Sequence, residues 1–300
     1  MKTQTVAVVL VNWNGIVDTL RCLTSLQFLD NEKGIEIKII VVDNASADAS
    51  ASVISAKFPN VELILEKKNL GFAGGSNVGI RAALSQGARY VWLLNNDTVV
   101  HRGALSLLRA MSDPSAGVAG SKIYFAAGHE YHRNRYRESE RGNVIWYAGG
   151  IIDWKNMYAS HRGVDEVDHG QFDTSEETQF ITGCSMMVKR EVFERVGLFD
   201  EKFYMYLEDV DFCLRAVEKG YTLLYVPQSI VWHKNAGSSS VGSELHQYYM
   251  TRNRLLVGMR YAPVRTKFAL AREAIRFMVI GPSIGRKAVM DAVVGKWGKA

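Results

Sequence analysis

Two side chains far apart in the sequence are of the types that bind a divalent metal ion. Asp97 ends the polar sequence Asn95-Asn96-Asp97, and His233 lies in Val231-Trp232-His233-Lys234. Sites for such ions commonly combine one or two protein carboxylates with phosphate and water oxygens, and a neutral imidazole is a further possible ligand. The alternatives are that Asp97 caps a helix and that His233 has a structural role. Asp97, with His233 second, is therefore a candidate site for Mg²⁺ or Mn²⁺.

Acidic residues also gather at the start of a predicted helix over residues 208–219. The helix dipole stabilises acids in a first turn, so a structural role is the simplest interpretation. The three acids Glu208, Asp209 and Asp211 nevertheless exceed what capping requires, and one of them can serve as a general base. Asp211 has Arg215 one turn later as an ion-pair partner. Asp209 has no charged partner on its own helix, so we predict that Asp209 is the base.

Two further polar segments suit a nucleotide. Asp43 follows a predicted strand over residues 35–42, where its carboxylate can accept the imide N–H of uracil or thymine. The alternative is that it stabilises the turn that it begins. The glycine-rich residues 69–77 precede a predicted helix over 78–84, and such a segment allows a diphosphate to approach the backbone. Its spacing differs from the dinucleotide-binding fingerprint, so alone it is a weak signal.

Alternating strands and helices are predicted to bring these polar segments together. Apolar runs at residues 6–11, 35–42, 61–65 and 90–94 are typical of buried strands, with helical segments between them. This order predicts β-α-β units and a mostly parallel sheet flanked by helices. In such a sheet the residues beyond the carboxyl ends of the strands line the ligand crevice. The polar segments are therefore expected to converge.

The second half of the chain is less regular. Residues 124–173 break the alternation and are expected to form a long loop or lid. A later strand is predicted over 223–226, ended by Pro227. The chain after Gly242 is expected to be helical, with an interruption at Gly281-Pro282.

Composition excludes several classes of protein. The 300 residues are 47% hydrophobic and 22% charged, as in an ordinary globular protein, and no apolar run approaches the roughly 18 to 20 residues that cross a bilayer. The three scattered cysteines are expected to be reduced thiols, and the start of the chain lacks a signal-peptide pattern, so the cytoplasm is the expected compartment. Eight Lys or Arg and two acids follow residue 264, and the rest of the chain is nearly neutral. This distribution argues against nucleic acid and for a local anionic partner of the tail.

Nine short motifs follow one another along the chain. They are Asn12-Trp13-Asn14-Gly15, Val41 to Ser46, Asn69 to Asn77, Leu93 to Asp97, Gly183-Cys184, Gly197 to Phe203, Tyr206 to Asp211, Val231-Trp232-His233 and Tyr248 to Arg254. In this order they resemble the motifs of the family 2 inverting glycosyltransferases, in particular the rhamnosyltransferase-like group, over about residues 5–256. The resemblance implies the GT-A fold, a Rossmann-like α/β domain over residues 1–260, with a nucleotide-sugar half (1–123) and an acceptor half (124–260). Residues 261–300 remain as a basic amphipathic helical extension.

The resemblance also implies roles for individual residues. Asp209 is the catalytic base, and Asp97 and His233 hold the metal. Acceptor binding is implied for Glu208, Gly183 and Cys184. Donor binding is implied for Asn12, Asp43, Asn69, Gly71, Gly74, Gly75, Asn77, Asn95, Asn96 and Arg252. Two departures stand out: Asn95 replaces an aspartate of many relatives, and Ser76 stands where many have an arginine, for which Arg252 is expected to compensate.

The function implied is an inverting, metal-dependent transfer of a sugar, rhamnose first, from a dTDP- or UDP-sugar to a glycan hydroxyl in bacterial cell-surface polysaccharide synthesis. The acceptor is expected to be lipid-linked, and the tail to lie on an anionic membrane at the cytoplasmic face of the inner membrane. The alternative for the tail is helical packing or dimerisation. The alternatives for the whole chain are a sugar-phosphate nucleotidyltransferase and a non-catalytic sugar-nucleotide-binding scaffold.

Overall fold

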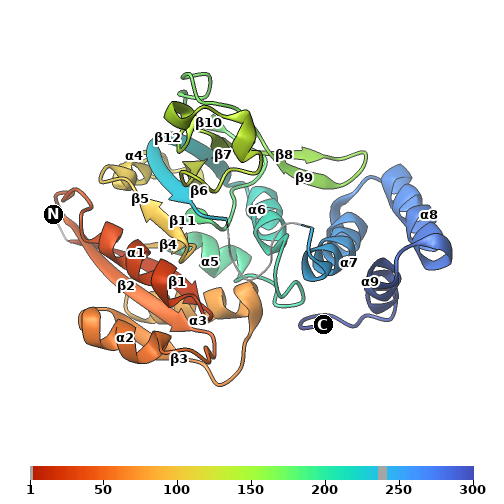
Figure 1. The fold of residues 1–300 in the computed structure, drawn as a ribbon, viewed down its shortest axis with the longest axis horizontal. Coiled ribbons are helices and arrows are strands. Elements are labelled where there is room, and N and C mark those ends of the chain that lie inside the picture. The colour runs from red at the N-terminus through yellow and green to blue at the C-terminus, as the bar shows by residue number, and fades with distance from the viewer. Residues whose placement is uncertain (1–2, 236–241) are drawn as a thin grey trace.

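The computed structural model describes residues 3–235 and 242–300 and is built around one large sheet (Figure 1). Its first half consists of parallel strands in the order β3-β2-β1-β4. The strands are β1 (Gln4–Asn12), β2 (Ile35–Asp43), β3 (Glu62–Leu65) and β4 (Tyr90–Leu94). The helices between them are α1 (Ile16–Leu26), α2 (Ser50–Lys57) and α3 (Gly71–Ser85). The predicted β-α-β units and α/β class are confirmed.

The second half of the sheet mixes parallel and antiparallel pairs. β11 (Ser185–Lys189) runs antiparallel to β4 and to β6 (Ala116–Phe125), and β6 pairs in parallel with β12 (Thr222–His233). Three short strands also pair antiparallel with this half: β5 (Thr98–Val100) and β10 (Glu176–Glu177) with β12, and β7 (Ile145–Tyr147) with β6. The accompanying helices are η1 (Ala104–Ser106), α4 (Leu107–Ala110), α5 (Arg190–Val196) and α6 (Glu208–Glu218).

Strand β12 continues past the proline that was expected to end it. Its register against β6 shifts between Val226 and Ile230, and Pro227 lies in this irregularity. Proline has no N–H to donate, so it is tolerated in a sheet at such a bulge. The continuation carries the chain to His233, which pairs with Thr98 of β5. The prediction of a strand over 223–226 is therefore too short, and His233 ends a strand.

Helix α3 begins at Gly71, so most of the glycine run lies inside a helix and not in a loop before one. A Cβ at Gly75 would lie 2.8 Å from Val11 Cγ1, and a Cβ at Gly79 would lie 2.3 Å from Val9 Cγ1. Glycine at these positions lets α3 pack closely on β1, because any side chain there would displace the valines. The predicted helix start at residue 78 is wrong for this reason.

The segment expected to form a long loop or lid contains regular elements. They are η2 (Arg133–Arg135), η3 (Glu138–Glu140), β7, and the hairpin of β8 (Gly150–Asp153) with β9 (Tyr158–His161). The Tyr147 hydroxyl donates a hydrogen bond to the carbonyl oxygen of Phe180 at 2.7 Å. The Trp232 indole N–H donates to the carbonyl of Gly142 at 2.9 Å. Such bonds fix the segment against the sheet, on the upper side of Figure 1.

A helical layer completes the chain on the right of Figure 1. It comprises α7 (Glu244–Tyr261), α8 (Val264–Ile280) and α9 (Ser283–Val293), and the predicted break at Gly281-Pro282 separates the last two. The Tyr248 hydroxyl donates to Asp291 Oδ2 at 2.6 Å and so ties α7 to α9. Within residues 3–235 and 242–300, no helix is long and apolar enough to cross a membrane.

Candidate active site

A cavity of about 800 Å³ opens at the carboxyl ends of the central strands. This is the place where open α/β sheets bind their ligands. Several of the predicted site residues line it together although they lie far apart in the sequence. They are Asn69, Gly71, Asn95, Asn96, Asp97, Gly183, Cys184, Glu208, Asp209 and His233.

Asp97 and His233 face each other in this cavity, and Asp97 Oδ1 lies 3.1 Å from His233 Nε2. Burial alone would raise the pKa of Asp97, but the adjacent imidazole lowers it below its ordinary value. Burial alone would lower the pKa of His233, but Asp97 and the neighbouring thiol of Cys184 raise it well above its ordinary value. The two side chains therefore form a nearly buried ion pair.

The same pair fits a divalent cation. A carboxylate oxygen and an imidazole nitrogen are ligands that Mn²⁺ accepts, and both reach one polar cavity. The buried Nδ1 of His233 has no hydrogen-bond partner, so it can hold the proton of a neutral ring whose Nε2 binds a cation in place of its hydrogen bond to Asp97. Across the described parts of the chain, no cluster of three or more His, Cys, Asp or Glu side chains is arranged to hold a metal. A cation here would take its remaining ligands from substrate phosphates and water.

Asp209 is held in the cavity by backbone donors. Its Oδ2 accepts a hydrogen bond from the amide of Gly183 at 2.9 Å, and its Oδ1 accepts one from the amide of Val210 at 2.8 Å. Burial raises the pKa of Asp209 above its ordinary value, while these donors oppose the rise because they favour the carboxylate. Burial is the larger of the two effects, so this carboxylate is a stronger base than that of an ordinary aspartate.

Glu208 differs from its neighbour in its hydrogen bonds. Its side chain is buried in the cavity wall, and Oε2 has no hydrogen-bond partner. Burial and the adjacent Asp209 raise the pKa of Glu208 well above its ordinary value. Two buried carboxyls side by side cannot both ionise easily. Glu208 is therefore the carboxyl of the pair that holds a proton more readily, and Asp209 is the one that ionises more readily.

Asp211, the third acid, faces away from the cavity. Its Oδ2 accepts from Arg215 at 2.8 Å, as the spacing predicts, and its Oδ1 accepts from Arg260 at 2.7 Å and from the Tyr261 hydroxyl at 2.8 Å. These bonds tie α6 to α7. Asp211 is a structural acid.

Asn12 and Asp43 are buried and are not among the residues that line the cavity. The register of β1 and β2 pairs them, and Asn12 Nδ2 donates to Asp43 Oδ2 at 2.8 Å. The amide of Ser46 donates to Asp43 Oδ1 at 2.8 Å. The prediction that Asn12 contacts the sugar-nucleotide donor is therefore wrong, because its side chain stabilises the turn after β2. The two bonds leave lone pairs on both oxygens of Asp43, so its contact with a pyrimidine stays a prediction.

Three more predicted donor residues belong to the packing of α3. Gly75 contacts Val11, and a Cβ at Gly74 would lie 2.7 Å from Leu70 Cβ. The side chain of Asn77 donates to the carbonyl of Phe199 at 2.9 Å and accepts from its amide at 3.0 Å. The prediction that Gly74, Gly75 and Asn77 contact the donor is wrong, because these positions face the sheet and the 199–201 segment.

Arg252 is also misplaced by the sequence prediction, which assigned it to the diphosphate. It is fully buried, and its guanidinium donates to the carbonyls of Lys202, Phe203 and Gly298. Met250 lines the cavity, and two residues further along a helix is about 200° around its axis. Arg252 therefore faces the opposite side of α7.

The cavity also has an aromatic wall that the sequence analysis missed. The ring of Trp146 meets His161 with centroids 4.3 Å apart and His233 with centroids 4.6 Å apart, both edge to face. Burial lowers the pKa of His161 to about 4, so this imidazole is neutral near pH 7. Their only sequence signal was the aromatic content of residues 124–173. Phe180, Tyr206, His246 and Met250 also line the cavity.

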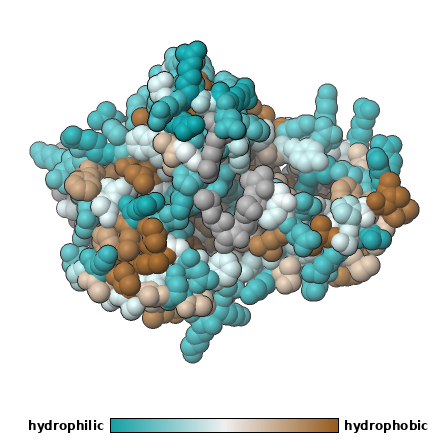
Figure 2. Space-filling model, viewed as in Figure 1, coloured by the Kyte–Doolittle hydropathy of each residue, from teal (hydrophilic) through white to brown (hydrophobic). Residues whose placement is uncertain are grey.

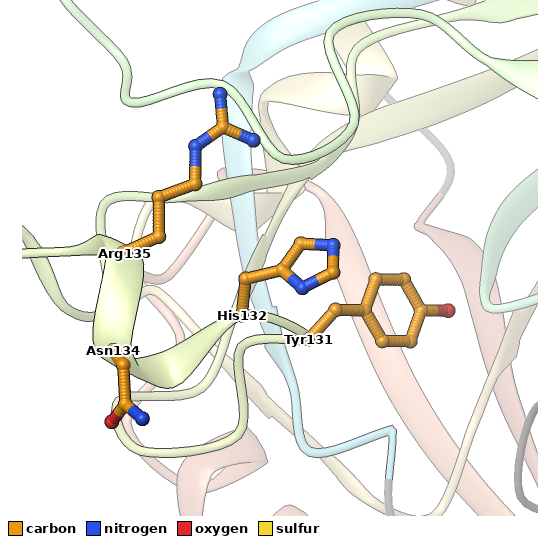
Figure 3. Close-up of a pocket in the computed structure, with 4 residues that line it drawn as sticks. All are labelled: Tyr131, His132, Asn134 and Arg135. Carbon is orange, nitrogen blue, oxygen red and sulfur yellow. The ribbon is translucent and has the colours of Figure 1, made fainter.

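A second hollow of about 440 Å³ borders this aromatic side and is lined by Tyr131, His132, Asn134 and Arg135 (Figure 3). In Figure 3, Tyr131 and His132 extend in the same direction, whereas Asn134 points away from them. Tyr131 lines the main cavity as well. The start of the 124–173 segment thus contributes to the cavity rim.

Curated relatives are similar over most of the chain. An N-acetylglucosaminyl-diphospho-decaprenol L-rhamnosyltransferase of Mycobacterium tuberculosis is 29% identical over 252 residues, which is 79% of this chain and 78% of that protein. The dTDP-rhamnosyl transferase RfbF of Shigella flexneri is 25% identical over 228 residues, 73% of this chain and 70% of that protein.

Solved structures share the fold. GalNAc-T7 with UDP, GalNAc and Mn²⁺ superposes on 99% of this chain with a TM-score of 0.69 at 16% identity, and the chain spans 55% of that protein. The mannosyltransferase PcManGT from Pyrobaculum calidifontis, in complex with GDP-Man and Mn²⁺, matches 98% of this chain and 76% of its own length, with a TM-score of 0.55 at 17% identity.

The mixed α/β sheet with its flanking helices is the GT-A fold that these glycosyltransferase structures share. The profile described as Glycosyl transferase family 2 matches residues 7–197, and the chain belongs to that family. The expectation from the sequence motifs is confirmed. A glycosyltransferase is thereby favoured over the nucleotidyltransferase and scaffold alternatives.

Proposed function

We propose that this glycosyltransferase moves L-rhamnose from dTDP-rhamnose to a hydroxyl of a lipid-diphosphate-linked sugar, with inversion at the anomeric carbon. The observation that carries the proposal is that Asp97 and His233 share one cavity with Glu208 and Asp209. The donor and acceptor classes are supported by the relatives, one named for an N-acetylglucosaminyl-diphospho-decaprenol and one for dTDP-rhamnose. UDP-sugars are the second donor class.

Each group has a distinct part in this reaction. Asp97 and His233 would hold the cation, which when bound neutralises the negative charge of the leaving nucleoside diphosphate. Asp209 accepts the proton of the acceptor hydroxyl as that oxygen bonds to the anomeric carbon, and the bond from this carbon to the diphosphate breaks on the opposite face. Glu208, carrying a proton, donates a hydrogen bond to a sugar oxygen. Gly183 holds Asp209 through its amide, and Cys184 contributes to the cavity wall.

We further propose that α8 rests on an anionic membrane, which brings the lipid-linked acceptor to the 1–260 unit. Val264, Phe268, Ile275 and Val279 are 70%, 73%, 66% and 70% exposed and share one helical face. Figure 2 shows apolar side chains at the right edge of the molecule, where Figure 1 places α8. A helix that lies on an anionic membrane carries cations beside its apolar face, and on α8 these are Arg265, Arg272 and Arg276.

The location follows from the same reasoning. A nucleotide-sugar donor and a membrane-bound acceptor meet at the cytoplasmic face of the inner membrane, where the enzyme would be peripheral. The product would serve the synthesis of a cell-surface polysaccharide.

Donor choice is tested by calorimetric titration of dTDP, UDP and GDP in the presence of Mn²⁺, followed by transfer assays with the matching sugar nucleotides. We expect dTDP to bind, and mass spectrometry to detect rhamnose on a polyprenyl-diphosphate-linked N-acetylglucosamine. Binding of GDP alone, with no response to dTDP or UDP, would overturn the donor assignment.

A further inference from the structure

The loop that leads into the catalytic helix has an unusual backbone. Tyr204, Tyr206 and Leu207 have φ angles of 64°, 68° and 68°, and none of them is glycine. L-residues adopt this left-handed region rarely, and such residues persist where surrounding contacts determine them. Leu207 immediately precedes Glu208 and Asp209 at the start of α6. The path of residues 203–207 therefore sets where the two carboxyls enter the cavity.

One buried side chain satisfies most of the carbonyls of this loop. Asn253 is fully buried in α7, and its Nδ2 donates to the carbonyls of Phe203 at 3.0 Å, Met205 at 2.8 Å and Tyr206 at 2.9 Å. Each of these carbonyls belongs to the residue immediately before a left-handed one. An extended loop would turn them away from Nδ2, so the amide selects the observed path.

Arg252 orients that amide and holds the start of the loop. Its Nε donates to Asn253 Oδ1 at 3.0 Å, which directs Nδ2 toward the loop. Its Nη2 donates to the carbonyls of Lys202 and Phe203, both at 3.0 Å. All of these bonds converge on the residues immediately before the catalytic pair.

The remaining donor of Arg252 reaches the end of the helical layer. Its Nη1 donates to the carbonyl of Gly298 at 2.7 Å, and the amide of Gly298 donates to the carbonyl of Lys202 at 2.9 Å. The guanidinium lies over the rings of Tyr249 and Trp297, 4.8 and 5.8 Å from their centroids. A guanidinium with all three nitrogens engaged in this way is occupied in the protein and is not available to a phosphate.

We propose that Arg252 and Asn253 are positioning residues for glycosyl transfer, which hold residues 203–207 in their left-handed path and thereby aim Glu208 and Asp209 at the reacting sugar. The assignment rests on the proposed function in taking Asp209 as the base. Trp297 and Gly298 contact the guanidinium of Arg252, so the C-terminal segment contributes to the geometry of the site without contacting substrate.

The first test follows the loop itself by hydrogen–deuterium exchange of peptides covering residues 199–210. Arg252→Lys keeps the charge but loses the fork of donors, and Asn253→Leu keeps the approximate size but donates nothing. Arg254→Lys is the matched control, because Arg254 is on the same helix and binds Glu273 and the carbonyl of Asn156. We expect faster exchange in the loop for Arg252→Lys and Asn253→Leu, and wild-type exchange there for Arg254→Lys.

The second test separates positioning from binding. A misplaced base lowers kcat, and displacements of about 1 Å can cost on the order of 10²-fold. We expect Arg252→Lys and Asn253→Leu to lose at least about tenfold in kcat, with the dissociation constants of dTDP and UDP unchanged. In both variants the pH at which kcat falls on the acid side, which reports the ionisation of Asp209, should also shift. Arg254→Lys should keep both the rate and the profile.

Three outcomes would overturn the proposal. One is unchanged loop exchange together with unchanged kcat per folded molecule. Another is a parallel loss of nucleotide affinity, which would return Arg252 to the diphosphate. The third is an equal effect of Arg254→Lys. If Arg252→Lys and Asn253→Leu do not fold, Trp297→Leu is used instead, because it removes the ring that lies against the Arg252 guanidinium. Loop exchange and kcat should then change in the same direction by smaller amounts. Wild-type exchange and kcat in Trp297→Leu would count against the proposal. If wild type transfers no sugar, the proposed function fails, but the exchange measurement still decides whether the cluster holds the loop.

Discussion

The backbone amide of Gly183 donates a hydrogen bond to Oδ2 of Asp209 at 2.9 Å, joining the segment before β11 to the first turn of α6. The adjacent Glu208 has a buried Oε2 without a partner. The amides of Gly183 and Val210 therefore stabilise negative charge on both oxygens of Asp209, whereas one oxygen of Glu208 has no donor. This asymmetry supports the proposal that Asp209 is the base and that Glu208 holds the proton.

Substitution of each acid by its amide should distinguish the roles of Glu208, Asp209 and Asp211. Asp209→Asn keeps size and hydrogen bonding but removes basicity, so it should lower kcat by about 10² to 10⁴-fold without affecting nucleotide binding. Glu208→Gln resembles the protonated acid and should cost much less. Asp211→Asn should mainly lower thermal stability, because it weakens the contacts to Arg215 and Arg260. A dead Asp211→Asn beside an active Asp209→Asn would exchange the roles.

The rate should depend on pH through Asp209. Burial raises its pKa above that of an ordinary aspartate, about 3.9, and only the carboxylate accepts a proton. Activity should therefore be present above the raised pKa and fall as the pH is lowered through it. Steady-state rates between pH 4 and 8 measure this limb, and the residual activity of Asp209→Asn should lack it. The same limb in that variant would assign it to another group.

Metal dependence should run through Asp97. Asp97→Ala should remove the gain in dTDP affinity that Mn²⁺ provides, and His233→Ala should reduce it, because the two side chains provide the protein ligands of the proposed site. Calorimetry with and without Mn²⁺ measures both. Full turnover of the wild type in excess EDTA would contradict the assignment.

Acid should destabilise the protein through His161. Burial lowers its pKa from 6.5 to about 4, so between these values the unfolded chain binds more protons than the folded one. The contribution of neutral His161 is intact above about pH 6.5 and is lost as the pH falls toward 4. Urea midpoints at pH 7 and pH 5 should differ less in His161→Gln than in wild type. Equal pH sensitivity of the two proteins would show that other groups are responsible.

Membrane contact should require the apolar face of α8. The pair of substitutions Phe268→Glu and Ile275→Glu should abolish sedimentation with phosphatidylglycerol vesicles at low salt, because acids replace apolar contacts and repel the surface. Phe28→Glu is the matched control, since Phe28 is similarly exposed, at 71%, on the α/β body. Added salt should weaken wild-type binding, as each basic residue contributes about 1 kcal/mol that is screened. If the wild type is a dimer that does not bind vesicles, and the two substitutions together convert it to a monomer, the face has a packing role instead.

The strand pattern predicted the fold and the cavity residues that follow the strands, and it did so for one physical reason. Parallel strands place their carboxyl ends at one edge, so residues such as Asn95 and Asp97 had to share a crevice. The roles of Gly75 and Arg252 were not predictable in this way. A glycine permits close approach of a ligand or of a strand, and its local sequence does not distinguish them. Arg252 depends on carbonyls 46 to 50 residues away in sequence, which no local pattern specifies.

The aromatic wall was missed for a related reason. β7 has three residues and β9 has four, too few to establish an alternating pattern. Trp146 and His161 reach the cavity because the segment folds back on the sheet. Their placement is a result of long-range packing.

The anomeric configuration of the product tests the central claim most directly. Purified wild-type enzyme with dTDP-rhamnose, Mn²⁺ and a polyprenyl-diphosphate-linked N-acetylglucosamine should yield a rhamnoside whose configuration, read by NMR, is opposite to that of the donor. A single displacement assisted by Asp209 has no other stereochemical outcome. A product that retains the donor configuration, or release of dTDP without a new glycosidic bond, would contradict the account.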